Sequence, residues 1–219
     1  MQPTKKPRFK ICCIGSIDEA QLAIRYGASA VGLVSTMPSG PGVIEESLIA
    51  RVAAAIPPGI ASVLLTSQLD VDTIIEQQRY CRVNTLQIVD RFPIDGYEKL
   101  REALPGVSIM QVIHVGGDES IDEAISIAAY VHGILLDSGN QALAIKELGG
   151  TGRTHNWAIS KRIREAVDVP IFLAGGLNAA NVAEAIATVQ PYAVDVCSGV
   201  RTNGKLDEEK LAQFVSQIR

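Results

Sequence analysis

Eight short runs of β-forming residues alternate with eight segments of helical spacing, and this alternation constrains the fold more than any other feature of the chain. The runs predicted as strands are residues 9–14, 30–35, 60–66, 83–88, 108–114, 131–136, 170–173 and 193–196. The segments predicted as helices are residues 18–26, 45–55, 72–79, 96–103, 121–129, 157–166, 179–187 and 207–218. A chain that repeats one strand and one helix in this way builds a parallel sheet covered by helices.

The spacing of the repeats favours a closed barrel over an open sheet. Strands begin roughly every 20 to 40 residues, which is the length of a strand plus its crossover helix. An open doubly wound sheet is the alternative, but the turn after the first strand has a single glycine, Gly15, and no dinucleotide-binding fingerprint. We therefore predict an α/β protein with one (βα)8 TIM barrel domain over residues 1–219.

Composition and charge exclude several classes of partner. The formal net charge of −4 gives no general attraction for nucleic acid or for an anionic membrane surface, so any phosphate must be bound locally. The apolar runs are too short to cross a bilayer and the polar residues 1–10 do not resemble a signal peptide, so we expect a cytoplasmic protein. Four cysteines without a Cys-x-x-Cys pair and three scattered histidines indicate reduced thiols and no zinc site.

The first predicted strand ends in residues that could carry chemistry, because side chains on a strand alternate between its two faces. Lys10 and Cys12 share one face. The other face carries Phe9, Ile11 and Cys13, and this apolar set suits the side that packs on helices. We therefore expect Lys10 and Cys12 to point into the barrel mouth and Cys13 to be structural. A thiol near an ammonium group can have a lowered pKa and act as a base or nucleophile. The alternative is that Cys12 is a small buried hydrophobe.

Asp137 follows the sixth predicted strand and precedes a long polar stretch. Active sites of α/β barrels form at the C-terminal ends of the strands, so a carboxylate at this point can act as a general acid. The alternative is a turn-forming or helix-capping aspartate. We expect the long loop to close over a ligand. Its glycine-rich segment consists of Gly149, Gly150, Thr151, Gly152 and Arg153.

Two glycine-bearing segments follow the seventh and eighth predicted strands. The first contains Gly175 and Gly176, and the second contains Ser198 and Gly199. In (βα)8 barrels this region commonly binds phosphate, because glycines let backbone N–H groups approach the phosphate oxygens. The hydroxyl of Ser198 is a further donor. We therefore predict a phosphate site here and a small phosphorylated metabolite as the substrate.

Five segments of the chain resemble the sequence pattern of the phosphoribosylanthranilate isomerases, which are barrel enzymes of tryptophan biosynthesis. The family pattern includes Lys-Ile-Cys-Gly, Leu-Leu-Asp-Ser, Gly-Gly-Thr-Gly-Lys-x-x-x-Trp, Ala-Gly-Gly-Leu and Val-Asp-Val-Ser-Ser-Gly-Val. The corresponding segments here are residues 10–13, 135–138, 149–157, 174–177 and 194–200. The resemblance extends over nearly the whole chain and is densest in its second half.

The resemblance implies an Amadori rearrangement that converts N-(5'-phosphoribosyl)anthranilate to a 1-deoxyribulose 5-phosphate. Asp137 would be the general acid that protonates the ribose ring oxygen, and Cys12, as a thiolate, would remove the C2′ proton. The loop around residues 149–153 would close over this phosphorylated sugar-amine substrate. The family implies no cofactor and no metal, and its barrels occur as monomers and homodimers. The phosphate would be held by Gly175, Gly176, Ser198 and Gly199.

The chain departs from the family pattern at the end of the site that would hold the amine. The family usually has an arginine in the loop after the second strand, where it pairs with the anthranilate carboxylate. Residues 39–43 contain no arginine, and losing the partner of a desolvated carboxylate costs about 2–5 kcal/mol. Arg91, Arg153 and Arg201 could replace it, although Arg201 follows the phosphate segment and is expected to meet phosphate or solvent.

Two other functions therefore stay open beside the family's own reaction. The chain could be an isomerase that acts on a different phosphoribosyl amine, which the missing arginine favours. It could also be a non-catalytic barrel that binds a phosphosugar, although the presence of both an acid position and a base position speaks against this reading.

Overall fold

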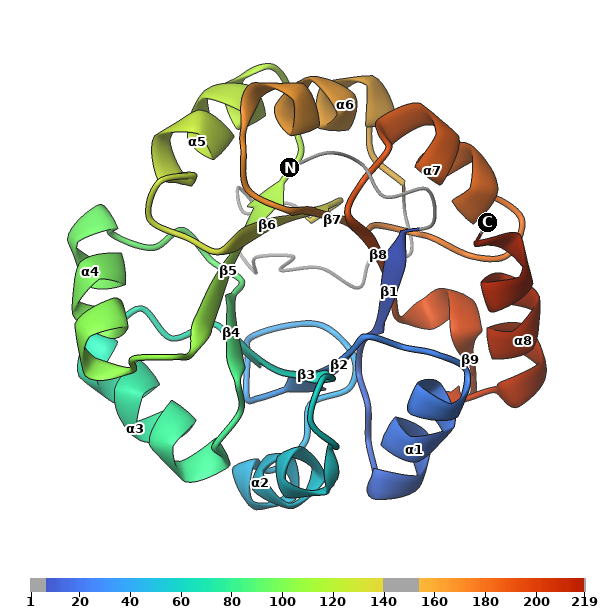
Figure 1. Ribbon diagram of the computed structural model, residues 1–219, viewed down its shortest axis with the longest axis horizontal. Helices are drawn as coiled ribbons and strands as arrows, with labels where there is room; N and C mark the ends of the chain where they lie inside the picture. The colour runs from blue at the N-terminus through green and yellow to red at the C-terminus, as the bar shows by residue number, and fades with distance from the viewer. Residues whose placement is uncertain (1–6, 140–153, 219) are drawn as a thin grey trace.

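The computed structural model describes residues 7–139 and 154–218, and within them eight parallel strands form one closed barrel with helices around its outside (Figure 1). The strands follow the order of the chain around the barrel, and pairing of the first strand with the eighth closes it. The predicted (βα)8 barrel is confirmed.

The elements observed lie close to the predicted ones. The strands are β1 (Arg8–Ile11), β2 (Ala30–Val34), β3 (Ala61–Thr66), β4 (Thr85–Ile88), β5 (Ser108–His114), β6 (Gly133–Asp137), β7 (Ile171–Leu173) and β8 (Ala193–Val196). The helices are α1 (Ile17–Arg25), α2 (Glu46–Ala55), α3 (Val71–Cys81), α4 (Ile94–Ala103), α5 (Glu119–Ile127), α6 (Trp157–Ala166), α7 (Val182–Val189) and α8 (Glu208–Gln217). A 3-10 turn and a small hairpin, which were not predicted, precede α8: η1 (Ser198–Val200), β9 (Arg201–Thr202) and β10 (Lys205–Leu206).

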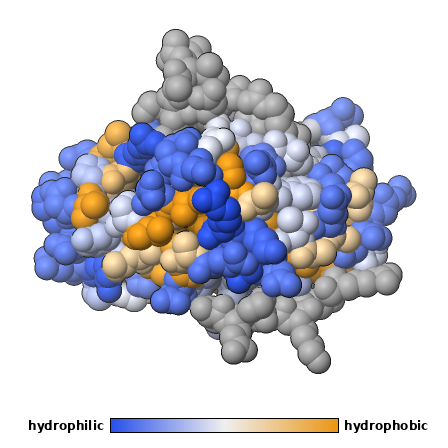
Figure 2. All heavy atoms as spheres, turned by 90° about the horizontal axis from the view of Figure 1, so that it is seen from above, coloured by the Kyte–Doolittle hydropathy of each residue, from blue (hydrophilic) through white to orange (hydrophobic). Residues whose placement is uncertain are grey.

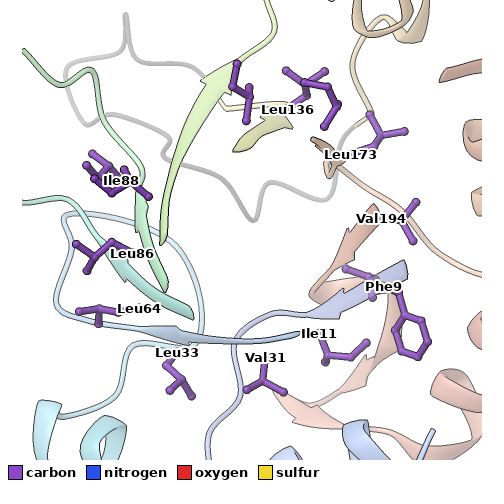
Figure 3. Close-up of a cluster of buried hydrophobic side chains, with 14 of the residues drawn as sticks. Phe9, Ile11, Val31, Leu33, Leu64, Leu86, Ile88, Leu136, Leu173 and Val194 are labelled. Carbon is purple, nitrogen blue, oxygen red and sulfur yellow. The ribbon is translucent and has the colours of Figure 1, made fainter. Parts of the chain in front are cut away.

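The barrel has an outer and an inner layer of buried side chains, because the strands are covered on both faces. The outer layer lies between strands and helices, where alternate residues of the strands point outward (Figure 3). Phe9 and Ile11 of β1 belong to this layer, as the alternation predicts. The inner layer fills the barrel and includes Val63, Leu65 and Met110 together with Cys12. Burial of each large aliphatic side chain contributes about 1.5–3 kcal/mol, so this packing fixes the strand ends that carry the site.

Side-chain caps define where several helices begin. The side chains of Ser16, Asp70, Asn156 and Asp207 accept hydrogen bonds from backbone N–H groups in the first turns of α1, α3, α6 and α8. Each cap of this kind contributes about 1 kcal/mol. The face in Figure 2 carries mostly hydrophilic residues with hydrophobic ones between them. Within the described ranges, none of the helices has the length and apolar character needed to cross a membrane.

Candidate active site

A cleft opens at the C-terminal ends of the barrel strands. Its volume is about 640 Å3, including the part that is open to solvent, which falls within the usual range for small-molecule sites. Loops from both halves of the barrel form its wall. The lining residues are Cys12, Cys13, Val34, Met37, Ser39, Gly40, Pro41, Leu65, Gln87, Asp137, Ala174, Gly175, Gly176, Leu177, Asp195, Val196, Cys197 and Ser198.

Cys12 and Asp137, the predicted base and acid, line this one cleft. Cys12 directly follows β1 and is 7% exposed, whereas Asp137 is the last residue of β6 and is half-buried. Asp137 Oδ1 accepts a hydrogen bond of 2.7 Å from the backbone N–H of Ser138, which fixes the carboxylate at the strand end. Asp137 therefore makes a turn contact and also lines the cleft, so its turn contact does not exclude a role in the cleft.

Lys10 lies one layer below the cleft floor. Its ammonium group is fully buried, and its Nζ lies 2.8 Å from Asp195 Oδ2 on the paired strand β8. Burial alone would lower the pKa of Lys10, but the negative charge of Asp195 and the proximity of Cys12 more than offset it and raise that pKa. A methyl group added at Gly32 would lie 3.1 Å from Lys10 Nζ and 2.9 Å from Cys12 Sγ. The ammonium nitrogen and the thiol sulfur therefore both lie next to Gly32. The predicted pairing of thiol and ammonium is confirmed, although Lys10 lies in the barrel interior and not in its mouth.

Cys13 faces the cleft, and the expectation that it packs on the helix side as a structural residue is wrong. β1 ends at Ile11, and Cys13 has a left-handed backbone with φ of 63°, so the alternation of a strand no longer applies to it. Its thiol contacts the thiols of Cys12 and Cys197. It also donates to Pro41 O at 3.6 Å. An S–H group has one proton, so Cys13 donates either to Pro41 or to its cysteine neighbours at any moment.

The hydrogen bond from Cys13 lowers the pKa of Cys12. Burial opposes this shift, and the positive charge of Lys10 reinforces it. Conversely, the contact with Cys12 raises the pKa of Cys13. The contact therefore favours ionisation of Cys12 over ionisation of Cys13, with Cys13 as the donor, which suits Cys12 for proton abstraction.

Arg201 does not meet phosphate or solvent, contrary to expectation. Its side chain is 7% exposed and its Nη2 donates to the backbone carbonyls of Cys12, at 3.0 Å, and Cys13, at 2.6 Å. Its Nη1 binds both carboxylate oxygens of Glu19 at 3.2 and 3.3 Å. Burial disfavours ionised Glu19, but N–H donation from the backbone of Leu206 and Gly15 and the charge of Arg201 hold the pKa of that carboxyl below its usual range. Arg201 therefore holds the backbone of the two cysteines from behind the cleft.

The two predicted phosphate segments come together at one side of the cleft. Gly175 and Gly176, with φ of 83° and 62°, follow β7 and line the cleft, as does Ser198 after β8. Gly199 does not line it. A Cβ at Gly199 would collide with Leu177 O and lie 3.0 Å from Asn178 Cα, so this glycine allows the two loops to approach each other. The predicted loop residues 149–153 lie outside the described residues.

Comparison with known proteins decides the family. The family model described as "N-(5'phosphoribosyl)anthranilate (PRA) isomerase" matches residues 9–217. The chain belongs to the phosphoribosylanthranilate isomerase family. The N-(5'-phosphoribosyl)anthranilate isomerase of Methanocella arvoryzae is 33% identical over 97% of this chain and 98% of its own length. That of Haloferax volcanii is 36% identical over 97% of this chain and 93% of its own length.

Solved structures of phosphoribosylanthranilate isomerases share the same barrel. The enzyme from Thermotoga maritima superposes with a TM-score of 0.83 at 28% identity, over 97% of this chain and 98% of the other. A second isomerase structure was solved in complex with reduced 1-(o-carboxyphenylamino)-1-deoxyribulose 5-phosphate. It superposes with a TM-score of 0.81 at 27% identity, over 97% of this chain and 98% of the other.

Two polar residues near the site were not among the site residues predicted from the sequence. Gln87 lines the cleft from β4, is 3% exposed, and its Oε1 has no hydrogen-bond partner among residues 7–139 and 154–218. His155 lies beside Gly175, and its Nε2 lies 2.7 Å from Ser160 Oγ. Burial lowers the pKa of His155 to about 4, so this ring is neutral near pH 7. The position of Gln87 near the end of a predicted strand and that of His155 after a long loop were the only signals that the sequence offered. In the same described ranges, no cluster of three or more His, Cys, Asp or Glu side chains could hold a metal ion.

Proposed function

We propose that this chain catalyses the isomerisation of N-(5'-phosphoribosyl)anthranilate, the reaction that gives its family its name. The observation that carries the proposal is the position of Cys12 and Asp137 in one cleft at the C-terminal ends of β1 and β6. The family membership of the chain supports it. As an enzyme of tryptophan biosynthesis the protein would work in the cytoplasm, as a monomer or a homodimer; a related isomerase from Thermotoga maritima is described as dimeric.

In this proposal the two groups divide the proton transfers. Asp137 gives a proton to the ribose ring oxygen, the bond from that oxygen to C1′ breaks, and the nitrogen lone pair forms a Schiff base. The Cys12 thiolate then takes the proton from C2′, which leaves an enolamine that tautomerises to the 2-keto product. The lowering of the Cys12 pKa by Cys13 and Lys10 favours this role, because the base must be ionised before the proton is removed.

The phosphate end would anchor the substrate while these transfers occur. Gly175 and Gly176 let their backbone N–H groups approach an anion, and Ser198 adds a hydroxyl donor on the same wall. Gly199 would contribute indirectly, by letting the loops after β7 and β8 pack together. The loop of residues 149–153 would exclude water once the substrate is bound.

The test is loss of the fluorescence of freshly prepared N-(5'-phosphoribosyl)anthranilate in the presence of purified protein. We expect the wild-type rate to exceed spontaneous decay by several orders of magnitude. Cys12→Ala and Asp137→Asn should each lower kcat by at least about 10²-fold, since each removes a general acid or base. Cys81→Ala is the matched control, because Cys81 is a buried thiol on α3, outside the cleft lining. A wild-type rate equal to spontaneous decay would refute the proposal.

A further inference from the structure

The amine end of the cleft carries no positive charge among the residues that the structure describes. This end, opposite the phosphate segments, consists of Val34, Met37, Ser39, Gly40, Pro41, Leu65 and Gln87. The ionisable groups that line the whole cleft within the described ranges are Asp137, Asp195 and three cysteines, all of them acids. A carboxylate on the amine component would therefore find no cation to pair with among the described residues that line the cleft.

The arginines that could have supplied a cation are used elsewhere. Arg91 lies at the surface, 70% exposed, and pairs with Glu123 at 3.1 Å. Arg201 is held by Glu19 and by the carbonyls behind the cleft. Arg153 lies outside the described residues. Within the described residues, neither Arg91 nor Arg201 replaces the loop arginine of the family.

Cys13 leaves no room for a side chain at position 42 in the loop after β2. Gly42 has φ of 80°, and a Cβ built on it would lie 2.9 Å from Cys13 Cα and 3.0 Å from Cys13 Sγ, and closer still to Cys13 Cβ. The sulfur of Cys13 also lies 3.6 Å from the carbonyl oxygen of Pro41, so the loop packs against the end of β1. A side chain at position 42 therefore has no room while Cys13 is present, and the family pattern has glycine at position 13.

Gln87 adds an acceptor at this end. Its Oε1 is buried at the cleft wall and lacks a partner among the described residues. A buried carbonyl oxygen gains from an N–H or O–H donor and is repelled by a carboxylate. An uncharged substituent beside Gln87 avoids that repulsion.

From these observations we infer that the site isomerises phosphoribosyl conjugates of uncharged aromatic amines with a kcat/KM that is higher than that for the anthranilate conjugate or within about tenfold of it. The inference rests on the proposed function, and it extends the substrate class from one carboxylated amine to neutral amines of the same size. Recognition would come from the phosphate end and from the shape of the loop after β2, and not from an ion pair at the amine.

The decisive experiment compares two conjugates that differ only in charge. Anthranilate and 2-aminobenzamide are nearly isosteric, and each condenses with ribose 5-phosphate to give a phosphoribosyl amine. We expect kcat/KM for the benzamide conjugate to equal or exceed that for the anthranilate conjugate, or to lie within tenfold below it. A preference of more than tenfold for anthranilate would overturn the inference and leave the proposed function standing. Absence of turnover with both conjugates would overturn both.

A variant pair tests where the amine lies. Ser39→Arg introduces a cation at the cleft wall, and Ser39→Gln introduces a neutral side chain of similar reach. We expect Ser39→Arg to shift the ratio of kcat/KM values toward anthranilate by at least tenfold relative to Ser39→Gln. Because the comparison uses a ratio, a loss of activity common to both substrates cancels. Equal ratios in the two variants would contradict the placement of the amine at this loop.

Discussion

Cys13 provides the sharpest test of how the site prepares its base. Its thiol donates to the Cys12 sulfur and lowers the pKa of Cys12, which burial alone would raise. Cys13→Ala removes this donor and keeps the Cβ, so the left-handed backbone at φ of 63° is under the same strain in both proteins. The substitution should therefore raise the pKa of Cys12 without displacing the Cys12 side chain.

The size of the effect follows from the type of bond that is lost. A hydrogen bond to a charged group contributes about 1.5–3 kcal/mol, and burial of both sulfurs leaves this value unscreened by solvent. Since 1.36 kcal/mol corresponds to a factor of ten, the thiolate of Cys12 becomes about 10- to 150-fold less populated at a pH below its pKa. At a pH above the raised pKa the base is ionised in both proteins, and the difference in rate disappears.

Two measurements report this shift. The pH profile of kcat/KM should keep its shape, with its acidic limb moved to higher pH in Cys13→Ala. Alkylation of Cys12 by iodoacetamide, followed by peptide mass spectrometry, should move in the same direction and needs no substrate. Cys81→Ala is the control for loss of a buried thiol outside the cleft lining. If the acidic limb and the alkylation profile of Cys13→Ala coincide with those of the wild type, Cys13 does not tune the base.

Three further substitutions test the supports of the site. Arg201→Lys keeps the charge beside Glu19 but loses the two-carbonyl contact, so kcat should fall about tenfold with little change in KM, as steady-state kinetics would show. Lys10→Met leaves the carboxylate of Asp195 buried and unpaired, and urea unfolding should show a loss of about 3–5 kcal/mol. Gly175→Ala places a Cβ 2.9 Å from the His155 ring at a left-handed φ, so the inhibition constant of inorganic phosphate should rise about tenfold. Unchanged phosphate inhibition would remove Gly175 from the anion site.

The fold was predictable because each repeat carries its own signal. The strand β5 and the helix α6 have the predicted bounds, since their apolar residues alternate or recur with the period of the element and their flanks break it. Other bounds shift by a few residues, and β1 ends at Ile11 although apolar residues continue to Ile14. Apolar residues in the mouth of a barrel are buried as thoroughly as those in a strand, so hydrophobicity alone could not reveal where the strand ends.

The site was predictable where a residue acts from the end of a strand. Cys12, Asp137, Gly175 and Ser198 line one cleft because parallel strands bring their C-terminal ends together. The position of Arg201 was not predictable in this way. Its partners include Cys12 and Glu19, which lie more than 180 residues earlier in the chain. Arg201 belongs to a short hairpin, and no periodic pattern in the sequence predicts that hairpin.

The departures from the family pattern form one coupled group around the end of β1. Cys13 stands where the family pattern has glycine; its carbonyl is held by Arg201 and its side chain fills the space beside Gly42. Its thiol donates to the base, Cys12. An arginine introduced at position 42 alone would meet the side chain of Cys13, and removing the thiol of Cys13 alone would raise the pKa of Cys12. A cation at position 42 therefore requires a smaller residue at position 13, and that change also removes the donor to Cys12, so the two changes are coupled through Cys13.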